Sequence, residues 1–150
     1  MYCHDVDIVL QEVPGQISIC FSISGCPVKC KGCHSPFLWK EGNGELLTSD
    51  RYIEILNKYK GYANCVLFMG GEWHHDELVQ KLTTARELGF ETCLYTGHES
   101  VPDDVMDKLT WIKTGPWVET LGGLESETTN QRFVEVKTKK LINNQFLKRM

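Results

Sequence analysis

The sequence predicts an α/β fold with a mostly parallel sheet, and three observations lead to this prediction. Short segments typical of strands recur along the chain, and amphipathic segments typical of helices separate them. The length of 150 residues fits one domain (1–150), and no linker rich in Pro, Gly or Ser divides it. A full TIM-type barrel takes about 250 residues. The expected architecture is therefore an incomplete, partial TIM-type barrel of about five strands with flanking helices.

The first strand is predicted at residues 17–24, where apolar and small polar side chains alternate. One face carries serine and cysteine side chains, which suits a strand that lines a ligand cavity. The other face consists of Ile17, Ile19, Phe21 and Ile23.

Helices and strands then alternate to the end of the chain. A helix is predicted at residues 48–60, because Thr48 or Ser49 can cap it and apolar residues recur with helical spacing. The other predicted helices cover residues 76–88 and a short stretch that Pro102 opens. The other predicted strands are 65–69, 92–96, 111–113 and 133–136.

Ligands of such folds bind at the carboxyl ends of the strands. Any site should therefore be built from the segments that follow these ends. Those segments are residues 24–34, 70–75, 97–100 and 114–116.

Charge and hydropathy exclude several classes of protein. The net charge of −4 argues against a general nucleic-acid binder. No apolar run of 18 residues could cross a membrane, and the first residues lack the pattern of a secretory signal, so a cytoplasmic protein is expected. The C-terminal segment of residues 138–150, here called the basic tail, is expected to be a solvated tail or a docking surface for an acidic partner.

Three of the seven cysteines form a cluster directly after the first predicted strand. Cys26, Cys30 and Cys33 have the spacing C-x3-C-x2-C, with Pro27 and Gly32 as suitable loop residues between them. An odd number of cysteines in a chain without a secretory signal favours metal binding over disulfides. The cluster therefore predicts a metal centre.

Four chemistries compete for this cluster. A four-iron, four-sulfur cluster with three thiolates would leave one iron open for a small molecule. Zinc would use the three cysteines and His34, but a second C-x2-C pair is missing. Haem attachment at residues 30–34 implies export, which the missing secretory signal argues against. A redox dithiol at Cys30 and Cys33 leaves Cys26 unexplained.

The three-cysteine motif after the first strand of an incomplete barrel resembles the radical S-adenosylmethionine enzymes. Other segments, spread over residues 5–135, resemble more narrowly the activating enzymes of anaerobic (class III) ribonucleotide reductases. These segments are Asp7-Ile8-Val9, Pro14-Gly15, Ser24-Gly25-Cys26, Gly32-Cys33-His34-Ser35, Tyr95-Thr96-Gly97, Thr114-Gly115-Pro116 and Thr129-Asn130-Gln131-Arg132.

The resemblance implies an enzyme with two cofactors, a [4Fe–4S] cluster with one open iron and S-adenosylmethionine. Reduction of the cluster would cleave S-adenosylmethionine to methionine and a 5′-deoxyadenosyl radical, which takes a hydrogen atom from a glycine of a large partner reductase. An electron donor such as a flavodoxin is implied as well. Residues 116–132 and the basic tail are candidate docking elements, because a glycine within a folded protein must reach an open side of the barrel.

The resemblance also assigns site residues. Gly70-Gly71-Glu72 would meet the amino group of S-adenosylmethionine, and here Trp73 follows where the family usually has Pro. Two glycines allow a close backbone approach, and a carboxylate accepts hydrogen bonds from an ammonium. The segment Gly32-Cys33-His34 is a candidate contact of the adenine. Three further residues are candidates for the methionine carboxylate or the ribose: Thr96, Lys113 and Ser126.

Several plainer alternatives remain open. His74 and His75 fit a polar helix start, Lys113 fits a solvated strand end, and Cys65 and Cys93 fit small buried apolar residues. The enzyme could activate another glycyl-radical enzyme or act on a small molecule. A protein without chemistry of its own, such as an iron–sulfur electron carrier, would need a fourth cysteine ligand, for which Cys20 and Cys65 are candidates.

Overall fold

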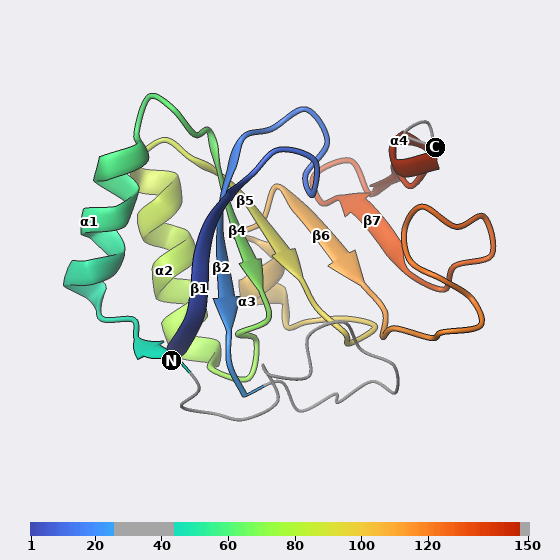
Figure 1. Cartoon of the computed structure of the whole chain (residues 1–150), viewed down its shortest axis with the longest axis horizontal. Helices are drawn as coiled ribbons and strands as arrows, with labels where there is room; N and C mark the ends of the chain where they lie inside the picture. Colours follow the sequence, from blue (N-terminus) through green and yellow to red (C-terminus); the bar gives the residue numbers. More distant parts are fainter. Residues whose placement is uncertain (26–43, 148–150) are drawn as a thin grey trace.

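The computed structural model describes residues 1–25 and 44–147, which form one mixed sheet with helices packed on it (Figure 1). The sheet has eight strands in the order β3-β1-β2-β4-β5-β6-β7-β8. The strands are β1 Tyr2–Val9, β2 Ser18–Ile23, β3 Glu45–Leu46, β4 Cys65–Met69, β5 Glu91–Tyr95, β6 Trp111–Thr114, β7 Arg132–Glu135 and β8 Lys140–Leu141. The helices are α1 Ser49–Tyr59, α2 His75–Glu87, α3 Asp103–Met106 and α4 Asn144–Leu147.

The five strands expected from the sequence are all present as β2, β4, β5, β6 and β7. The sheet is parallel only in its middle, from β2 through β4 and β5 to β6, and the pairs on both sides of this group are antiparallel. The sequence missed β1, β3 and β8, because two of them are two residues long and β1 has no cluster of turn residues before it. The partial barrel stays a prediction.

The described helices begin close to where the sequence places them. Thr48 caps α1 as expected, since its hydroxyl accepts a hydrogen bond from the backbone N of Arg51 at 3.1 Å. Apolar side chains of α1 and α2 then pack on one face of the sheet, together with α3. In the described part of the chain, no helix is long and apolar enough to cross a bilayer.

The second face of the sheet is also buried. Cys20, predicted to line a ligand cavity, instead lies in an apolar cluster with Val13 and Leu124. The basic tail contributes to this cluster, since Ile142 and Phe146 are buried and the rings of Phe133 and Phe146 lie 5.1 Å apart. Much of the basic tail is therefore part of the fold and not a solvated extension.

We expect Phe146→Ala to lower the free energy of unfolding by about 3 kcal/mol, because it removes a buried aromatic side chain and leaves a cavity. Urea denaturation measures the loss, and Gln145→Ala, an exposed neighbour in α4, is the matched control. An unchanged midpoint for Phe146→Ala would mean that α4 adds nothing to the core. Deletion of residues 138–150 would remove the same contacts, so it cannot test docking by itself.

Candidate functional site

The carboxyl ends of the four parallel strands β2, β4, β5 and β6 meet at one edge of the sheet (Figure 1). Ser24 and Gly25 follow β2 at this edge and are joined directly to Cys26. The predicted ligands Cys26, Cys30 and Cys33, and the predicted adenine contacts Gly32 and His34, lie outside the described residues. The other predicted site residues lie within them.

Gly70 and Gly71 form a tight turn after β4. Their φ angles are 83° and 108°, a region that L side chains rarely adopt. A Cβ atom on Gly70 would lie 2.6 Å from the Trp73 ring, and one on Gly71 would lie 3.4 Å from Ile23 of β2. Glycine is therefore required at Gly70 for both conformation and space. The turn brings Glu72 back toward β5.

Trp73 links this turn to the chain that enters the cysteine segment. Its indole N–H donates to the carbonyl oxygen of Ser24 at 3.2 Å, and its ring packs on the core. Trp73 stands where the family usually has Pro, and its hydrogen bond and packing stabilise the turn. This bond could not be predicted, because Ser24 and Trp73 are far apart along the chain.

Glu72 is buried at the centre of the site, with 6% of its side chain exposed. Its Oε1 accepts a hydrogen bond from the Thr96 hydroxyl at 2.7 Å, whereas Oε2 is buried without a hydrogen-bond partner among the described residues. Burial raises the pKa of the Glu72 carboxyl, and the hydrogen bond from Thr96 and electrostatic interactions with His98 and Lys113 oppose this increase. A buried carboxyl with one open oxygen suits a ligand that carries an ammonium group.

Lys113 is not the solvated strand-end lysine that the sequence allowed. The residue is 9% exposed, and its ammonium donates to the carbonyl oxygens of Thr96 at 3.3 Å and Gly115 at 2.9 Å. These bonds hold the segment after β6 against the end of β5. Lys113 therefore places a fixed positive charge beside the Glu72 carboxyl.

Ser126 has a different environment from the other candidates. It lies in the loop between β6 and β7, where its hydroxyl donates to the carbonyl oxygen of Leu121 at 2.9 Å and accepts from the backbone N of Thr128. These bonds shape the loop and do not connect Ser126 to Glu72. A contact of Ser126 with a cofactor stays a prediction.

His98 belongs to the site, although the sequence did not single it out. Its Nε2 lies 3.7 Å from Glu72 Oε1, and its backbone N donates to the Thr96 hydroxyl at 3.1 Å. Its carbonyl oxygen accepts from the backbone N of Gly115. The sequence pointed to His98 only through its position in residues 97–100, a segment predicted to contribute to a site.

His74 and His75 form the polar start of α2, as expected. The His75 ring also bridges two elements, since Nδ1 lies 2.9 Å from Asp76 and Nε2 lies 2.7 Å from a carboxylate oxygen of Asp104 in α3. Hydrogen bonds to Asp104 and then to Asp76 raise the pKa of His75.

The raised pKa of His75 predicts a pH-dependent stability. A histidine whose folded pKa exceeds its unfolded value of 6.5 contributes fully below that value, and the contribution is lost as pH rises through the folded pKa. We therefore expect wild type to lose its advantage over His75→Gln over the pH range that extends upward from about 6.5. Urea midpoints of both proteins measure this difference. A constant difference across that range would contradict the role of His75.

The four cysteines among the described residues are all buried. Cys20 and Cys65 are buried, and burial raises the pKa of each thiol to about 12. Both thiols lie in the apolar cluster on the second face of the sheet, among side chains such as Leu67 and Phe133. Cys93 is buried as well, and Cys65 and Cys93 are the small core residues that the sequence predicted. Residues 1–25 and 44–147 contain no group of three or more side chains placed to bind a metal ion.

The donor set that remains fits an iron–sulfur cluster with an open iron. Three cysteines stand within eight residues of sequence, and thiolates are the usual ligands of such clusters. The chain enters this segment at the same sheet edge that holds the open oxygen of Glu72. A cluster and a small cationic ligand would thus be held on adjacent segments.

Comparisons with known proteins agree with this composition of the site. The family model described as "4Fe-4S single cluster domain" matches residues 14–121, which include the three cysteines, Glu72, Thr96 and Lys113. The pyruvate formate-lyase-activating enzyme of Clostridium pasteurianum is 30% identical over 93 residues, which are 58% of this chain and 39% of that enzyme. The chain thus spans about two fifths of the length of that relative. No solved structure matches the chain.

Proposed function

The chain belongs to the 4Fe–4S single cluster domain family, and from this premise we propose that it activates anaerobic ribonucleotide reductase. The activation would generate a glycyl radical in the reductase through reductive cleavage of S-adenosylmethionine at a [4Fe–4S] cluster. One observation carries the proposal: the open oxygen of buried Glu72 lies at the sheet edge where the chain enters the three-cysteine segment. When bound, the cluster supplies the electron that cleaves S-adenosylmethionine.

Different residues of this chain would bind the cluster and the separate parts of S-adenosylmethionine. Cys26, Cys30 and Cys33 would ligate three irons and leave the fourth to S-adenosylmethionine. Glu72 would accept hydrogen bonds from the amino group of S-adenosylmethionine, while Thr96 fixes the orientation of the carboxyl through its 2.7 Å bond. Lys113 would balance the methionine carboxylate, and Gly32 and His34 would contact the adenine. Ser126 would act through the shape of the loop between β6 and β7.

Two observations support a glycyl-radical enzyme as the partner. The similarity to the pyruvate formate-lyase-activating enzyme supports activation of this class of enzyme in general. The segments that resemble reductase activases support the narrower target, and two of them contact each other in the fold. The Asn130 amide donates to the carbonyl oxygen of Pro116 at 3.0 Å.

A second candidate is activation of another glycyl-radical enzyme, such as pyruvate formate-lyase. The identity of 30% to an activating enzyme named for that partner favours this alternative. The two candidates share the same cofactors and differ only in the protein that donates the hydrogen atom. An experiment therefore distinguishes the two candidate functions by the partner protein and not by the chemistry of the cofactors.

The test begins with anaerobic reconstitution of the chain with iron and sulfide, followed by reduction. Electron paramagnetic resonance is recorded with and without S-adenosylmethionine, and released methionine is measured. A four-iron signal that changes on addition, with methionine released, is the expected result. A four-iron signal indifferent to S-adenosylmethionine would favour an electron carrier, and stoichiometric zinc without a cluster would favour a structural metal site.

The partner is tested next with the same preparation. We expect an organic radical signal to form when anaerobic ribonucleotide reductase is added, and substitution of the radical-bearing glycine of the reductase should abolish it. A signal with pyruvate formate-lyase instead would establish the second candidate. A reduced flavodoxin can replace the chemical reductant in either mixture, which tests the expected electron donor.

A further inference from the structure

One edge of the sheet carries a surface that the proposed site does not use. Strand β2 pairs with one edge of β1, whereas on the other edge β3 covers only Tyr2 and Cys3. Within the described residues, no strand pairs with this outer edge from Asp5 to Val9. An uncovered strand edge presents backbone N–H and C=O groups that can pair with another chain. We call β1 from Asp5 to Val9 the open edge.

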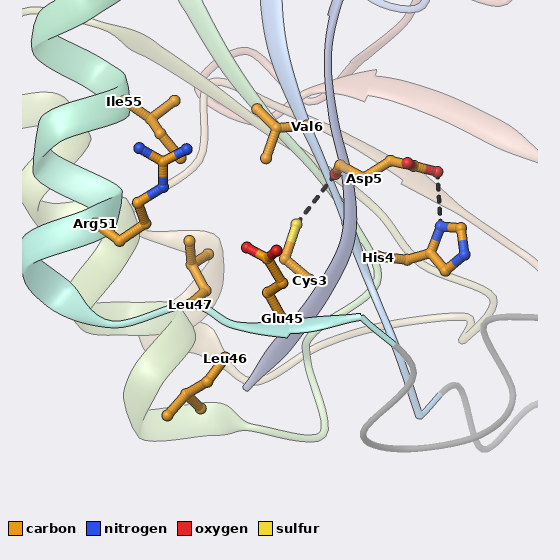
Figure 2. A pocket seen from close by; sticks show the side chains of 9 residues that line it. All are labelled: Cys3, His4, Asp5, Val6, Glu45, Leu46, Leu47, Arg51 and Ile55. Atoms are coloured by element: carbon orange, nitrogen blue, oxygen red, sulfur yellow. Dashed lines mark hydrogen bonds and ion pairs between the residues drawn. The ribbon is translucent and has the colours of Figure 1, made fainter.

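The side chains of the open edge alternate in character. Val6 and Ile8 are 38% and 42% exposed, which is high for large apolar residues on an ordered strand. They point toward α1, whereas Asp5 points to the opposite side of β1, as Figure 2 shows for Val6 and Asp5. By strand alternation, Asp7 shares the side of Asp5. The open edge thus has one apolar side and one acidic side.

Two cavities accompany the apolar side of the open edge. The first, of about 250 Å³, lies between the start of β1 and α1, with Val6, Arg51 and Ile55 among its lining residues (Figure 2). The second, of about 380 Å³, is lined by Ile8, Lys58, Tyr59, Tyr62 and Ala63. The second could receive an apolar side chain from a strand paired with β1, whereas the first is also lined by the charged side chains of Glu45 and Arg51.

The charges argue against a second copy of this chain as the occupant. Antiparallel pairing of two β1 strands centred on Val6 would place Asp5 opposite the Asp7 of the other copy. Pairing centred on Asp7 would place the two Asp7 carboxylates opposite each other. Like charges in such positions destabilise a strand pair, whereas lysine or arginine there would stabilise it.

We propose that the open edge binds an extended segment of a partner protein in which apolar side chains alternate with lysine or arginine. The apolar side chains would lie over Val6 and Ile8, and the basic ones would lie opposite Asp5 and Asp7. The start of β1 adjoins the site, because Ser24 donates from its backbone N to the carbonyl oxygen of Tyr2 at 3.0 Å. A segment bound there would lead the partner chain toward the site, so the inference rests on the proposed function.

The experiment uses the whole chain and two labelled peptides of nine residues. One peptide alternates valine with lysine, and the other alternates valine with glutamate. Fluorescence anisotropy at low salt should show at least tenfold tighter binding of the lysine peptide, and amide hydrogen exchange should slow between Asp5 and Val9. Asp5→Lys/Asp7→Lys should reverse the preference. Glu87→Lys/Asp107→Lys, which changes the net charge equally at exposed positions of other elements, should keep it.

Several results would overturn the docking proposal. Equal binding of both peptides, reversal by the control variant, or protection outside β1 would each do so, as would a dimer whose formation protects the open edge. Cleavage of S-adenosylmethionine without any partner is measured on the same proteins and should not change in Asp5→Lys/Asp7→Lys. Absence of cleavage in wild type would overturn the proposed function, whereas normal cleavage without peptide preference would overturn the docking proposal alone.

Discussion

A chain with Cys26→Ala is expected to lose its iron–sulfur cluster and, with it, all reductive cleavage of S-adenosylmethionine. Three thiolates are available in the segment, and the buried thiols of Cys20 and Cys65, with pKa values of about 12, cannot readily replace one. Iron and sulfide per chain after anaerobic reconstitution measure the loss of the cluster, and methionine release measures the loss of activity.

The matched control for this substitution is Cys65→Ala, which removes a thiol of the core. It should keep the cluster, with at most a modest loss of stability. A reconstituted cluster in Cys26→Ala would show that Cys26 is not a ligand. Loss of iron in Cys65→Ala, with the chain still folded, would instead support the electron-carrier alternative with a fourth cysteine ligand.

Replacing Glu72 with Gln is expected to weaken the binding of S-adenosylmethionine by about thirtyfold or more. Removing one partner of a buried charge pair costs about 2–5 kcal/mol, and each 1.4 kcal/mol is a factor of ten. The reconstituted protein is titrated with S-adenosylmethionine, and Glu127→Gln, an exposed position in the loop between β6 and β7, serves as control. Unchanged affinity in Glu72→Gln would exclude Glu72 from the binding site.

The stability of Glu72→Gln separates lost binding from unfolding. Burial raises the pKa of Glu72 above its ordinary value of 4.5. The folded state therefore favours the protonated carboxyl, and stability falls as pH rises through the folded pKa. A glutamine has no charge to bury, so the variant should be at least as stable as wild type at neutral pH. By the same reasoning, wild-type affinity for a cationic ligand should decrease as pH falls through this pKa.

The elements of the middle of the sheet could be predicted because their signals are local. Strand β4 is a continuous apolar run, α1 has a capping threonine and helical spacing, and the glycines after β4 mark a turn. The edge strands could not be predicted in the same way. Strands β3 and β8 depend on pairing with neighbours, and β1 carries Asp5 and Asp7 among its four exposed residues, so no apolar run marks it.

The candidate site also has features that local sequence predicts and features that depend on the fold. The types and spacing of Cys26, Cys30 and Cys33 indicate a metal centre without any structure, because ligand chemistry depends on side-chain type. The partners of Glu72 could not be read from the sequence. Thr96 and His98 come from the segment that follows β5, the next strand of the sheet. The buried state of Lys113 follows from the packing of the segment after β6.

The sequence by itself determined the alternation of strands and helices, the three cysteines and the Gly-Gly-Glu turn, since each is written in neighbouring residues. Only the tertiary structure decided the bond from Trp73 to Ser24, the open oxygen of Glu72 and the inclusion of Phe146 in the core. The physical reason is that burial and hydrogen-bond partners arise from parallel strands that bring distant segments to one edge, and no local pattern records which segments meet there.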